Sequence, residues 1–131
     1  MNKWKYKIDI SCNCVFGEIE KEYGVKFSDE LKAFITEYNA ATPEKHRFMV
    51  GTTERVFGAV LSVNKGETDT DSIYTALDVI NDKDIIPFAI DPFGNYICYS
   101  ANDGIVMYWD HENDTKASTN LNLSGFIASL Y

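Results

Sequence analysis

The stretch IIPFAIDPFGNYICYSANDGIVMYWDHEND, residues 85–114, decides the fold of this chain. Three apolar runs alternate with three polar turns, and the first turn contains Asp-Pro-Phe-Gly, a composition that type I turns prefer. Asn102-Asp103-Gly104 is a second hairpin signal, and residues 110–114 form a looser third turn. Because tight turns join antiparallel neighbours, this stretch predicts a β-meander with strands at residues 86–90, 96–100 and 105–109.

Helical patterns lie on both sides of the meander. Ser28 is a suitable N-cap for a helix that Asn39 can end, and the apolar residues between them recur at i, i+3, i+4 and i+7. The same reasoning predicts helices at residues 15–23, with Gly24 as C-cap, and at residues 123–130. A further helix begins near Asp71 or Ser72 and ends near residue 81. The apolar helix residues are Val15, Phe16, Ile19, Tyr23, Leu31, Phe34, Ile35, Tyr38, Ile73, Tyr74, Leu77, Ile80, Leu123, Phe126, Ile127 and Leu130.

Short runs rich in β-forming residues occupy positions 48–50 and 56–63, and a last short strand is predicted at residues 116–119. The order of elements is therefore helix, helix, strands, helix, meander, helix. This order predicts an α+β fold, in which an antiparallel or mixed sheet carries helices packed on one face. The length of 131 residues is enough for one domain and too short for two ordinary ones, so residues 1–131 are interpreted as a single domain.

Composition excludes several classes of protein. Hydrophobic residues make up 45% and aromatic residues 14%, which argues against disorder. No apolar run approaches the roughly 18 residues that span a bilayer, and no apolar segment follows the first lysines as it would in a secretory signal. Cys12 and Cys14 are too close in sequence for an ordinary disulfide, and Cys98 lies inside an apolar run. Cysteine usage thus indicates a reducing, cytoplasmic setting.

Charge is distributed unevenly along the chain. The net charge is −8, but residues 1–65 have a balance of +1, whereas residues 66–131 contain two lysines and eleven acids. Such a surface repels nucleic acid and anionic membranes and attracts a basic partner. Acidity could also serve solubility alone. Because solubility does not require the acids to gather in one half of the chain, their segregation favours a protein partner with a basic surface.

Metal sites are not indicated. Cys12-x-Cys14 could combine with His46 and His111, but structural zinc usually requires a wider cysteine spacing and a second close pair of ligands. Asp69-x-Asp71 and Asp110-x-Glu112-x-Asp114 resemble calcium loops weakly, and both lack the glycine that an EF-hand loop needs in order to turn. The first pair is better interpreted as a helix cap and the second group as a solvated turn.

Catalysis is not indicated either. Asp110, His111 and Glu112 could act as acid and base, but adjacent residues of a strand point to opposite faces. The chain contains no Gly-x-Ser-x-Gly elbow, phosphate-binding loop or dinucleotide fingerprint. We therefore expect a protein with no catalytic residues, no metal and no cofactor.

Aromatic residues cluster in the meander. About half of them must fill the core, because a strand has two faces. Phe93, at the tip of a turn, either folds back into the protein or stands exposed as an apolar anchor. Exposed aromatic side chains beside carboxylates are typical of protein-binding surfaces. The set comprises Phe93, Tyr96, Tyr99, Tyr108 and Trp109.

Four blocks of the sequence resemble the SUKH superfamily. VKFSDELKAF through Tyr38-Asn39 resembles its opening motif, and IPFA followed by GNYIC resembles its core. GIVMYWDHE resembles its conserved strand, and residues 124–130 resemble its closing helix. The blocks keep their order from about residue 16 to the end. The chain departs from the pattern at Phe93, where a glycine is common, and at Ala40-Ala41, where glycines usually follow Tyr-Asn.

The resemblance implies an α+β fold and a binding function without catalysis. The superfamily includes yeast Smi/Knr-like regulators of cell-wall synthesis and many bacterial immunity proteins, which neutralise toxins that are often nucleases. The chain is therefore expected to be an immunity protein or antitoxin that binds a basic toxin domain, or alternatively a protein-binding scaffold or regulatory module in a housekeeping pathway. A toxin gene beside its own gene would favour the first hypothesis, and genomic isolation would favour the second.

Seven acids of the second half are expected to form one connected acidic rim, with Phe93 and Tyr99 near its middle: Asp69, Asp71, Asp91, Asp103, Asp110, Glu112 and Asp114. In this hypothesis the carboxylates steer a cationic partner and the aromatic residues hold it. The expected partner-binding residues are Asp69, Asp71, Asp91, Phe93, Asn95, Tyr99, Asp103, Asp110, Glu112 and Asp114.

Overall fold

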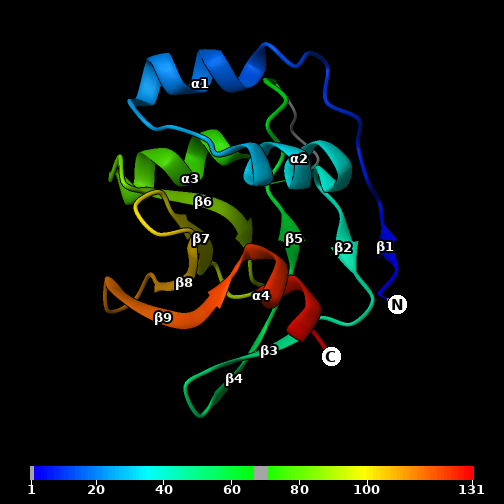
Figure 1. The fold of residues 1–131 in the computed structure, drawn as a ribbon, viewed down its shortest axis with the longest axis vertical. Helices are drawn as coiled ribbons and strands as arrows, with labels where there is room; N and C mark the ends of the chain where they lie inside the picture. Colours follow the sequence, from blue (N-terminus) through cyan, green and yellow to red (C-terminus); the bar gives the residue numbers. More distant parts are fainter. Residues whose placement is uncertain (1, 67–70) are drawn as a thin grey trace.

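The predicted meander forms the centre of the molecule. In the computed structural model, which describes residues 2–66 and 71–131, β6 (Ile85–Ile90), β7 (Tyr96–Ser100) and β8 (Ile105–Asp110) are consecutive antiparallel strands. β5 (Ala59–Val60) and β9 (Thr115–Asn122) pair with the outer strands and complete a five-stranded sheet of order β5-β6-β7-β8-β9 (Figure 1). The α+β fold class is confirmed.

The strand register places the turns of the meander at two opposite ends of the sheet. Ile90 pairs with Tyr96 and Tyr96 pairs with Trp109, so the 91–95 turn and the 110–114 turn share one end. Ile85 pairs with Ser100 at the other end, where the 101–104 turn lies. We call the first the Phe93 end, formed by residues 91–95 and 110–114, and the second the Asp103 end, formed by residues 101–104.

The region before α3 differs from the prediction of one strand at residues 56–63. β3 (Arg47–Val50) and β4 (Thr53–Val56) form a separate hairpin, and β5 begins only at Ala59. Gly58 separates them, because its N–H donates to the Ile90 carbonyl and a Cβ there would lie 2.6 Å from that oxygen. A pair of short strands, β1 (Trp4–Lys5) and β2 (Thr42–Pro43), was not predicted, and β9 is longer than expected.

The four helices lie where the sequence predicts them: α1 (Val15–Tyr23), α2 (Asp29–Tyr38), α3 (Ile73–Ile80) and α4 (Leu123–Ser129). Ser28 and Ser72 cap α2 and α3, since their hydroxyls accept from the N–H groups of Leu31 and Tyr74. Gly24 ends α1 in the left-handed conformation expected of a C-cap. No helix in the described residues is long and apolar enough to cross a membrane.

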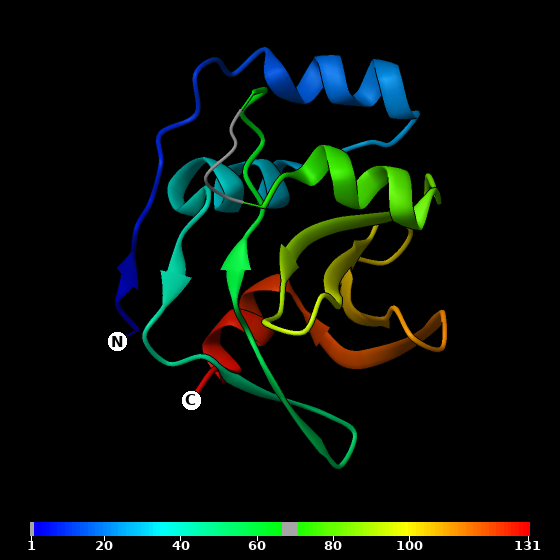
Figure 2. The ribbon, with the colours of Figure 1, turned by 180° about the vertical axis from the view of Figure 1, so that it is seen from behind.

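Aromatic contacts join α2 to the five-stranded sheet and α4 to the β3–β4 hairpin. The rings of Phe34 in α2 and Phe88 in β6 have centroids 5.8 Å apart, and those of Phe126 in α4 and Phe48 in β3 are 5.1 Å apart. Figure 1 shows α2 and α4 in front of the sheet, while Figure 2, seen from behind, shows α1 and α3 side by side above β6. All five residues of β7 are buried, so this strand is the centre of the core.

Ala40, which stands where the superfamily commonly has a glycine, has a φ of 64°. A left-handed conformation costs alanine more than glycine, so the chain keeps here the backbone shape that a glycine would adopt more easily. Ala41, the next residue, is fully buried, and its carbonyl accepts from the N–H of Val60. The departure from the pattern therefore places an alanine in a backbone conformation that suits glycine.

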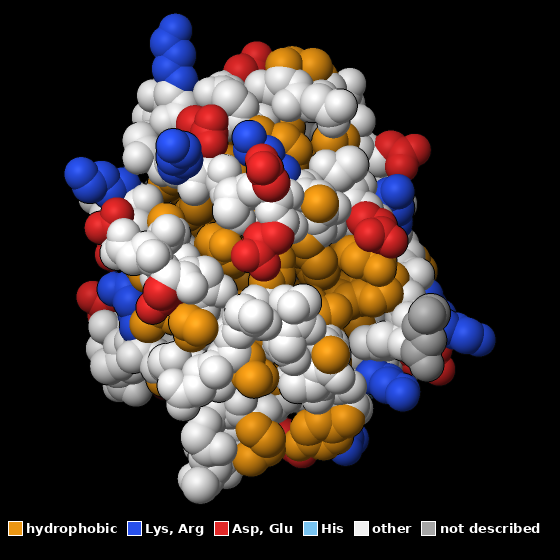
Figure 3. Space-filling model, viewed as in Figure 1, with side chains coloured by type: hydrophobic (Ala, Val, Ile, Leu, Met, Phe, Trp, Pro, Cys, Tyr) orange, Lys and Arg blue, Asp and Glu red, His pale blue; other side chains and the backbone are white. Residues whose placement is uncertain are grey.

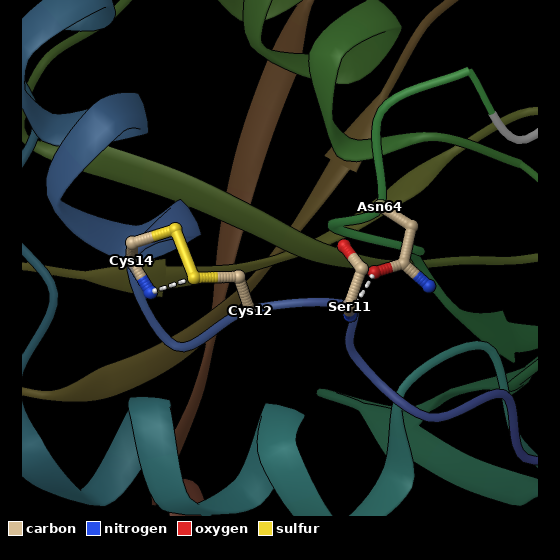
Figure 4. Close-up of a disulfide and its surroundings, with 4 residues drawn as sticks. All are labelled: Ser11, Cys12, Cys14 and Asn64. Carbon is tan, nitrogen blue, oxygen red and sulfur yellow. Dashed lines mark hydrogen bonds between the residues drawn. A yellow bond between two sulfur atoms is a disulfide. The ribbon is translucent and has the colours of Figure 1, made fainter.

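Cys12 and Cys14 form a disulfide just before α1, which corrects the expectation that they are unbonded (Figure 4). The chain turns between them, so their Cα atoms are 5.2 Å apart, within the usual range for a disulfide. Ser11 fixes the preceding backbone, since its N–H donates to the side-chain oxygen of Asn64. Cys98 is a buried free thiol whose pKa is raised by burial. Cysteine usage therefore no longer indicates a reducing compartment.

Candidate functional site

Asp91 organises the first turn of the meander from inside. Its carboxylate is 4% exposed and has four hydrogen-bond donors around it. The backbone N–H groups of Phe93 and Asn95 donate to it at 2.8 Å each, the Asn95 amide donates at 3.0 Å and the Tyr108 hydroxyl at 2.6 Å. A buried carboxylate is stable when hydrogen bonds replace water, so the turn is held by these contacts.

Asn95 joins this turn to the 110–114 turn. While its amide group donates to Asp91, its side-chain oxygen accepts from the backbone N–H of His111 at 3.0 Å, and the His111 Nδ1 lies 2.6 Å from the same oxygen. The His111 ring also packs near Gly94. The two turns of the Phe93 end are therefore one connected unit.

Phe93 stands exposed at the tip of the first turn, with 73% of its surface accessible. Of the two alternatives left by the sequence, the structure selects the exposed one. The backbone beneath it is fixed, because its own N–H is bonded to Asp91. An exposed aromatic side chain on a fixed turn loses little conformational freedom when it binds, which suits an apolar anchor.

Three acids accompany Phe93 at this end of the sheet. Asp114 accepts from the indole N–H of Trp109 at 2.9 Å, and Asp110 accepts from the backbone N–H of Glu112. Glu112 and Asp114 are exposed and Asp110 is half-buried. None of the three forms an ion pair within the described residues. Their negative charge is therefore available to a partner that approaches Phe93.

The expectation of one connected acidic rim is wrong in two respects. Asp91 is buried, so it is part of the turn's interior and contributes no exposed charge. Asp103 is exposed, but it lies at the opposite end of the sheet from Phe93, because successive turns of a meander alternate between ends. Asp71 is exposed before α3, and Asp69 lies outside the described residues.

Tyr99 is also away from Phe93 and is 4% exposed. Its hydroxyl accepts from the Ser28 hydroxyl at 2.9 Å and donates to Glu30 at 3.1 Å, which joins β7 to the start of α2. Burial raises its pKa, and the Glu30 carboxylate raises it further. Tyr99 therefore has a structural role in this protein, and its predicted place near the middle of the rim is wrong.

Arg55 was missed by sequence reasoning. Its guanidinium lies over the Tyr108 ring, 4.7 Å from the ring centre, and the hydroxyl of the same ring donates to Asp91. Burial and the hydrogen bond to Asp91 raise the pKa of Tyr108, while the charge of Arg55 opposes this shift. No sequence signal could identify Arg55, since only the position of the β3–β4 hairpin brings it to β8.

The described residues contain no group of three His, Cys, Asp or Glu side chains that could hold a metal ion. His111 is hydrogen-bonded to an amide, while Asp110 accepts within its own turn. The arrangement at the Phe93 end is thus a fixed aromatic residue beside exposed carboxylates. This arrangement can bind another molecule through the apolar surface of Phe93 and the negative charge of the carboxylates.

A family model matches most of this chain. The model of the SMI1 / KNR4 family (SUKH-1) matches residues 16–129, which is most of the sequence. A search among curated proteins gives no match. The chain belongs to the SMI1 / KNR4 family (SUKH-1), as the four sequence blocks suggested.

Proposed function

We propose that this SUKH-1 protein is a non-catalytic immunity protein that binds and neutralises a cognate bacterial toxin domain with a basic surface, such as a nuclease. Family membership is consistent with this role. The observation that carries the proposal is the exposed Phe93 beside Asp110, Glu112 and Asp114 at one fixed end of the sheet. An aromatic anchor surrounded by charge is a common arrangement in protein interfaces.

Each part of the Phe93 end would have its own task. Phe93 would enter an apolar pocket of the toxin domain, and the three carboxylates would attract lysines and arginines around that pocket. Asn95 would act indirectly, by holding the two turns together through Asp91 and His111. Since these turns are already ordered by hydrogen bonds, binding would require little rearrangement.

The proposal also covers the partners that are disfavoured and the location of the protein. A net charge of −8 with eleven acids in the second half disfavours nucleic acid and anionic membranes as partners. We propose a cytoplasmic location, where an immunity protein meets a toxin that has entered the cell. Asp71 and Asp103 are exposed at other places and would add to long-range attraction without touching the partner.

The test requires a toxin domain encoded beside the gene of this protein, and the absence of such a gene would favour the alternative function, a scaffold or regulatory module. Purified toxin domain and immunity protein are mixed, and association and dissociation rates are measured at two salt concentrations. Phe93→Ala should shorten the lifetime of the complex by at least about 30-fold, which corresponds to the 2 kcal/mol typical of an anchor residue. Glu112→Gln should mainly lower the association rate and weaken its dependence on salt.

Two control variants make these effects interpretable. Tyr6→Ala removes another exposed aromatic side chain, 78% accessible, from the N-terminal segment, and should leave the lifetime unchanged. Glu22→Gln removes an exposed charge on α1 and should affect the association rate less than Glu112→Gln. If the toxin domain is acidic, or if Phe93→Ala and Tyr6→Ala behave alike, the proposal is wrong for this surface.

The alternative is a protein-binding scaffold or regulatory module, as in the yeast members of the superfamily. It predicts no toxin gene nearby and no protection of cells. Co-expression in a sensitive strain distinguishes the two: an immunity protein restores growth in the presence of the toxin domain, and a scaffold does not.

A further inference from the structure

A second surface, between α2 and α4, is apolar and has no partner among the described residues. It forms a groove of about 390 Å³ on the front of the molecule, where Figure 3 shows hydrophobic side chains gathered around a hollow. One wall comes from α2 and the other from α4. The lining residues are Glu30, Ala33, Phe34, Glu37, Tyr38, Leu123, Ser124, Ile127 and Ala128.

The groove continues past the end of α2. Tyr38, Ile127 and Ala128 also line the neighbouring hollow of about 440 Å³, together with Asn2, Trp4, Lys45 and Leu130, so a cation lies at this far end of the groove. The rings of Trp4 and Tyr38 are 4.6 Å apart, and those of Tyr38 and Phe34 are 5.2 Å apart. Three aromatic rings in contact therefore form a continuous apolar floor.

The two walls differ in charge. Glu30 and Glu37 are seven positions apart on α2, so they lie on the same side of the helix, about 10 Å apart along its axis. Both are exposed. The opposite wall presents Ser124 and Ala128, and the sequence of α4, LSGFIAS, contains no charged residue. The groove is therefore apolar along its floor and acidic along one edge.

We propose that this groove binds an amphipathic helix that carries lysine or arginine on one flank of its apolar stripe. A groove between two helices with an apolar floor suits a third helix, whose side chains at i, i+3, i+4 and i+7 form one stripe. Cations seven positions apart on such a helix have the spacing of Glu30 and Glu37. The proposal does not depend on the function of the Phe93 end, which lies on other elements.

Two other occupants fit the charges less well. In a symmetric dimer that sets the α2 helices of the two copies side by side, their acidic edges would lie close together. A fatty acid would leave Glu30 and Glu37 without a cationic partner. A cationic helix is the occupant whose charge complements the acidic edge and whose apolar side chains match the floor.

The test uses synthetic peptides of about 18 residues, long enough for about five helical turns. Two peptides share one leucine and alanine stripe, and they differ in whether lysine or glutamate occupies the flank. A third has the lysine composition in scrambled order. Binding is measured by calorimetry, and the site is located by NMR chemical shifts of the full-length protein.

The lysine peptide should bind at least about tenfold more tightly than the glutamate peptide, with shifts at Phe34, Tyr38 and Ile127. Glu37→Lys should remove or reverse this preference, and Glu22→Lys, which changes the same charge on α1, should leave it unchanged. Because Glu37 and Glu22 are both exposed, neither variant is expected to unfold the protein.

Three results would overturn the proposal. One is equal binding of the lysine peptide and its scrambled form, because no helical stripe would then be recognised. Another is a set of shifts confined to the Phe93 end. The third is concentration-dependent dimerisation, seen by sedimentation, that excludes the peptide and so assigns the groove to a second copy. None of these results bears on toxin binding through Phe93, so the two proposals fail separately.

Discussion

The two ends of the meander place an aspartate in similar turns and use it in opposite ways. Asp91 precedes Pro-Phe-Gly and is buried beneath its turn, with four donors around its carboxylate. Asp103 precedes Gly104 and is exposed, and its carboxylate accepts from the backbone N–H of Ile105 at 3.0 Å. One carboxylate therefore stabilises the fold, and the other contributes surface charge.

The neighbouring strand explains the difference. At the Phe93 end, the hydroxyl of Tyr108 in β8 and the side-chain amide of Asn95 both donate to the Asp91 carboxylate. At the Asp103 end the nearby hydroxyl, that of Tyr99, is directed to Ser28 and Glu30 of another element. Turn chemistry alone does not determine whether an aspartate is a surface charge, because the residues across the sheet decide it.

The largest effect should come from Asp91→Ala. The substitution leaves four donors without their acceptor inside the protein, and we expect the free energy of unfolding to fall by about 3 kcal/mol or more. Asp103→Ala removes one exposed hydrogen bond and should cost about 1 kcal/mol or less. Urea denaturation of both variants measures the contrast. Equal losses would show that the buried network is not what separates the two turns.

Alkaline pH should reveal the same network. Burial and the hydrogen bond to Asp91 raise the pKa of Tyr108 above its ordinary value of 10.0. Above pH 10 the unfolded chain loses the phenolic proton while the folded protein retains it, so stability falls as pH rises, by up to about 1.4 kcal/mol per pH unit for one such group.

Tyr108→Phe should therefore lower stability at neutral pH by about 2 kcal/mol and make its decline above pH 10 shallower. Tyr6→Phe, at a 78% exposed position, controls for the loss of a hydroxyl. Denaturation curves at a series of pH values provide the measurement. An unchanged slope in Tyr108→Phe would mean that this hydroxyl does not keep its proton in the folded protein.

Local signals predicted the elements of this fold well. Helix caps and turn residues act over four or five positions, so a short segment of sequence is enough to predict them. Examples are the caps at Ser28, Ser72 and Gly24 and the turns around Gly94 and Gly104. The break at Gly58 was missed because its cause is the carbonyl of Ile90, 32 positions away. The Cys12–Cys14 bond was missed because it depends on how the backbone turns before α1.

The candidate site was only partly predictable for the same reason. Exposure of Phe93 and its nearness to the 110–114 turn were among the expected possibilities, since a turn tip and a meander can be inferred from sequence. The burial of Asp91 and Tyr99 depends on partners in β8 and α2. The sequence alone therefore does not distinguish an aspartate that is hydrogen-bonded inside the protein from one that faces solvent.

A smaller effect should separate the glycines of the two turns. Gly94 and Gly104 both have positive φ, 88° and 74°, so an alanine at either position should cost about 1 kcal/mol through backbone strain. At Gly104 the new Cβ would also lie 3.3 Å from the Tyr99 hydroxyl, which Ser28 and Glu30 hold in place. At Gly94 the nearest atom is 3.7 Å away, on the exposed His111 ring.

Gly104→Ala should therefore lower the melting temperature more than Gly94→Ala, and calorimetry of the two variants measures the difference. If Gly94→Ala is the more damaging, the contact with Tyr99 is less confining than its distance suggests, and the packing of the His111 ring against Gly94 matters more to the fold.

The smallest effect on stability is expected within the 91–95 turn itself, two residues from the largest one. Phe93 is 73% exposed, so Phe93→Ala removes little buried apolar surface and should change the free energy of unfolding by no more than about 0.5 kcal/mol. Its backbone N–H still donates to Asp91 in the variant, so the turn keeps its shape.

Thermal and urea denaturation of Phe93→Ala beside Asp91→Ala test this expectation. A loss of 2 kcal/mol or more would mean that the ring packs against the protein in solution, and that Phe93 is not free to contact a partner. An unchanged stability, combined with a shorter-lived complex, would separate the residue that binds from the residue that holds it in position.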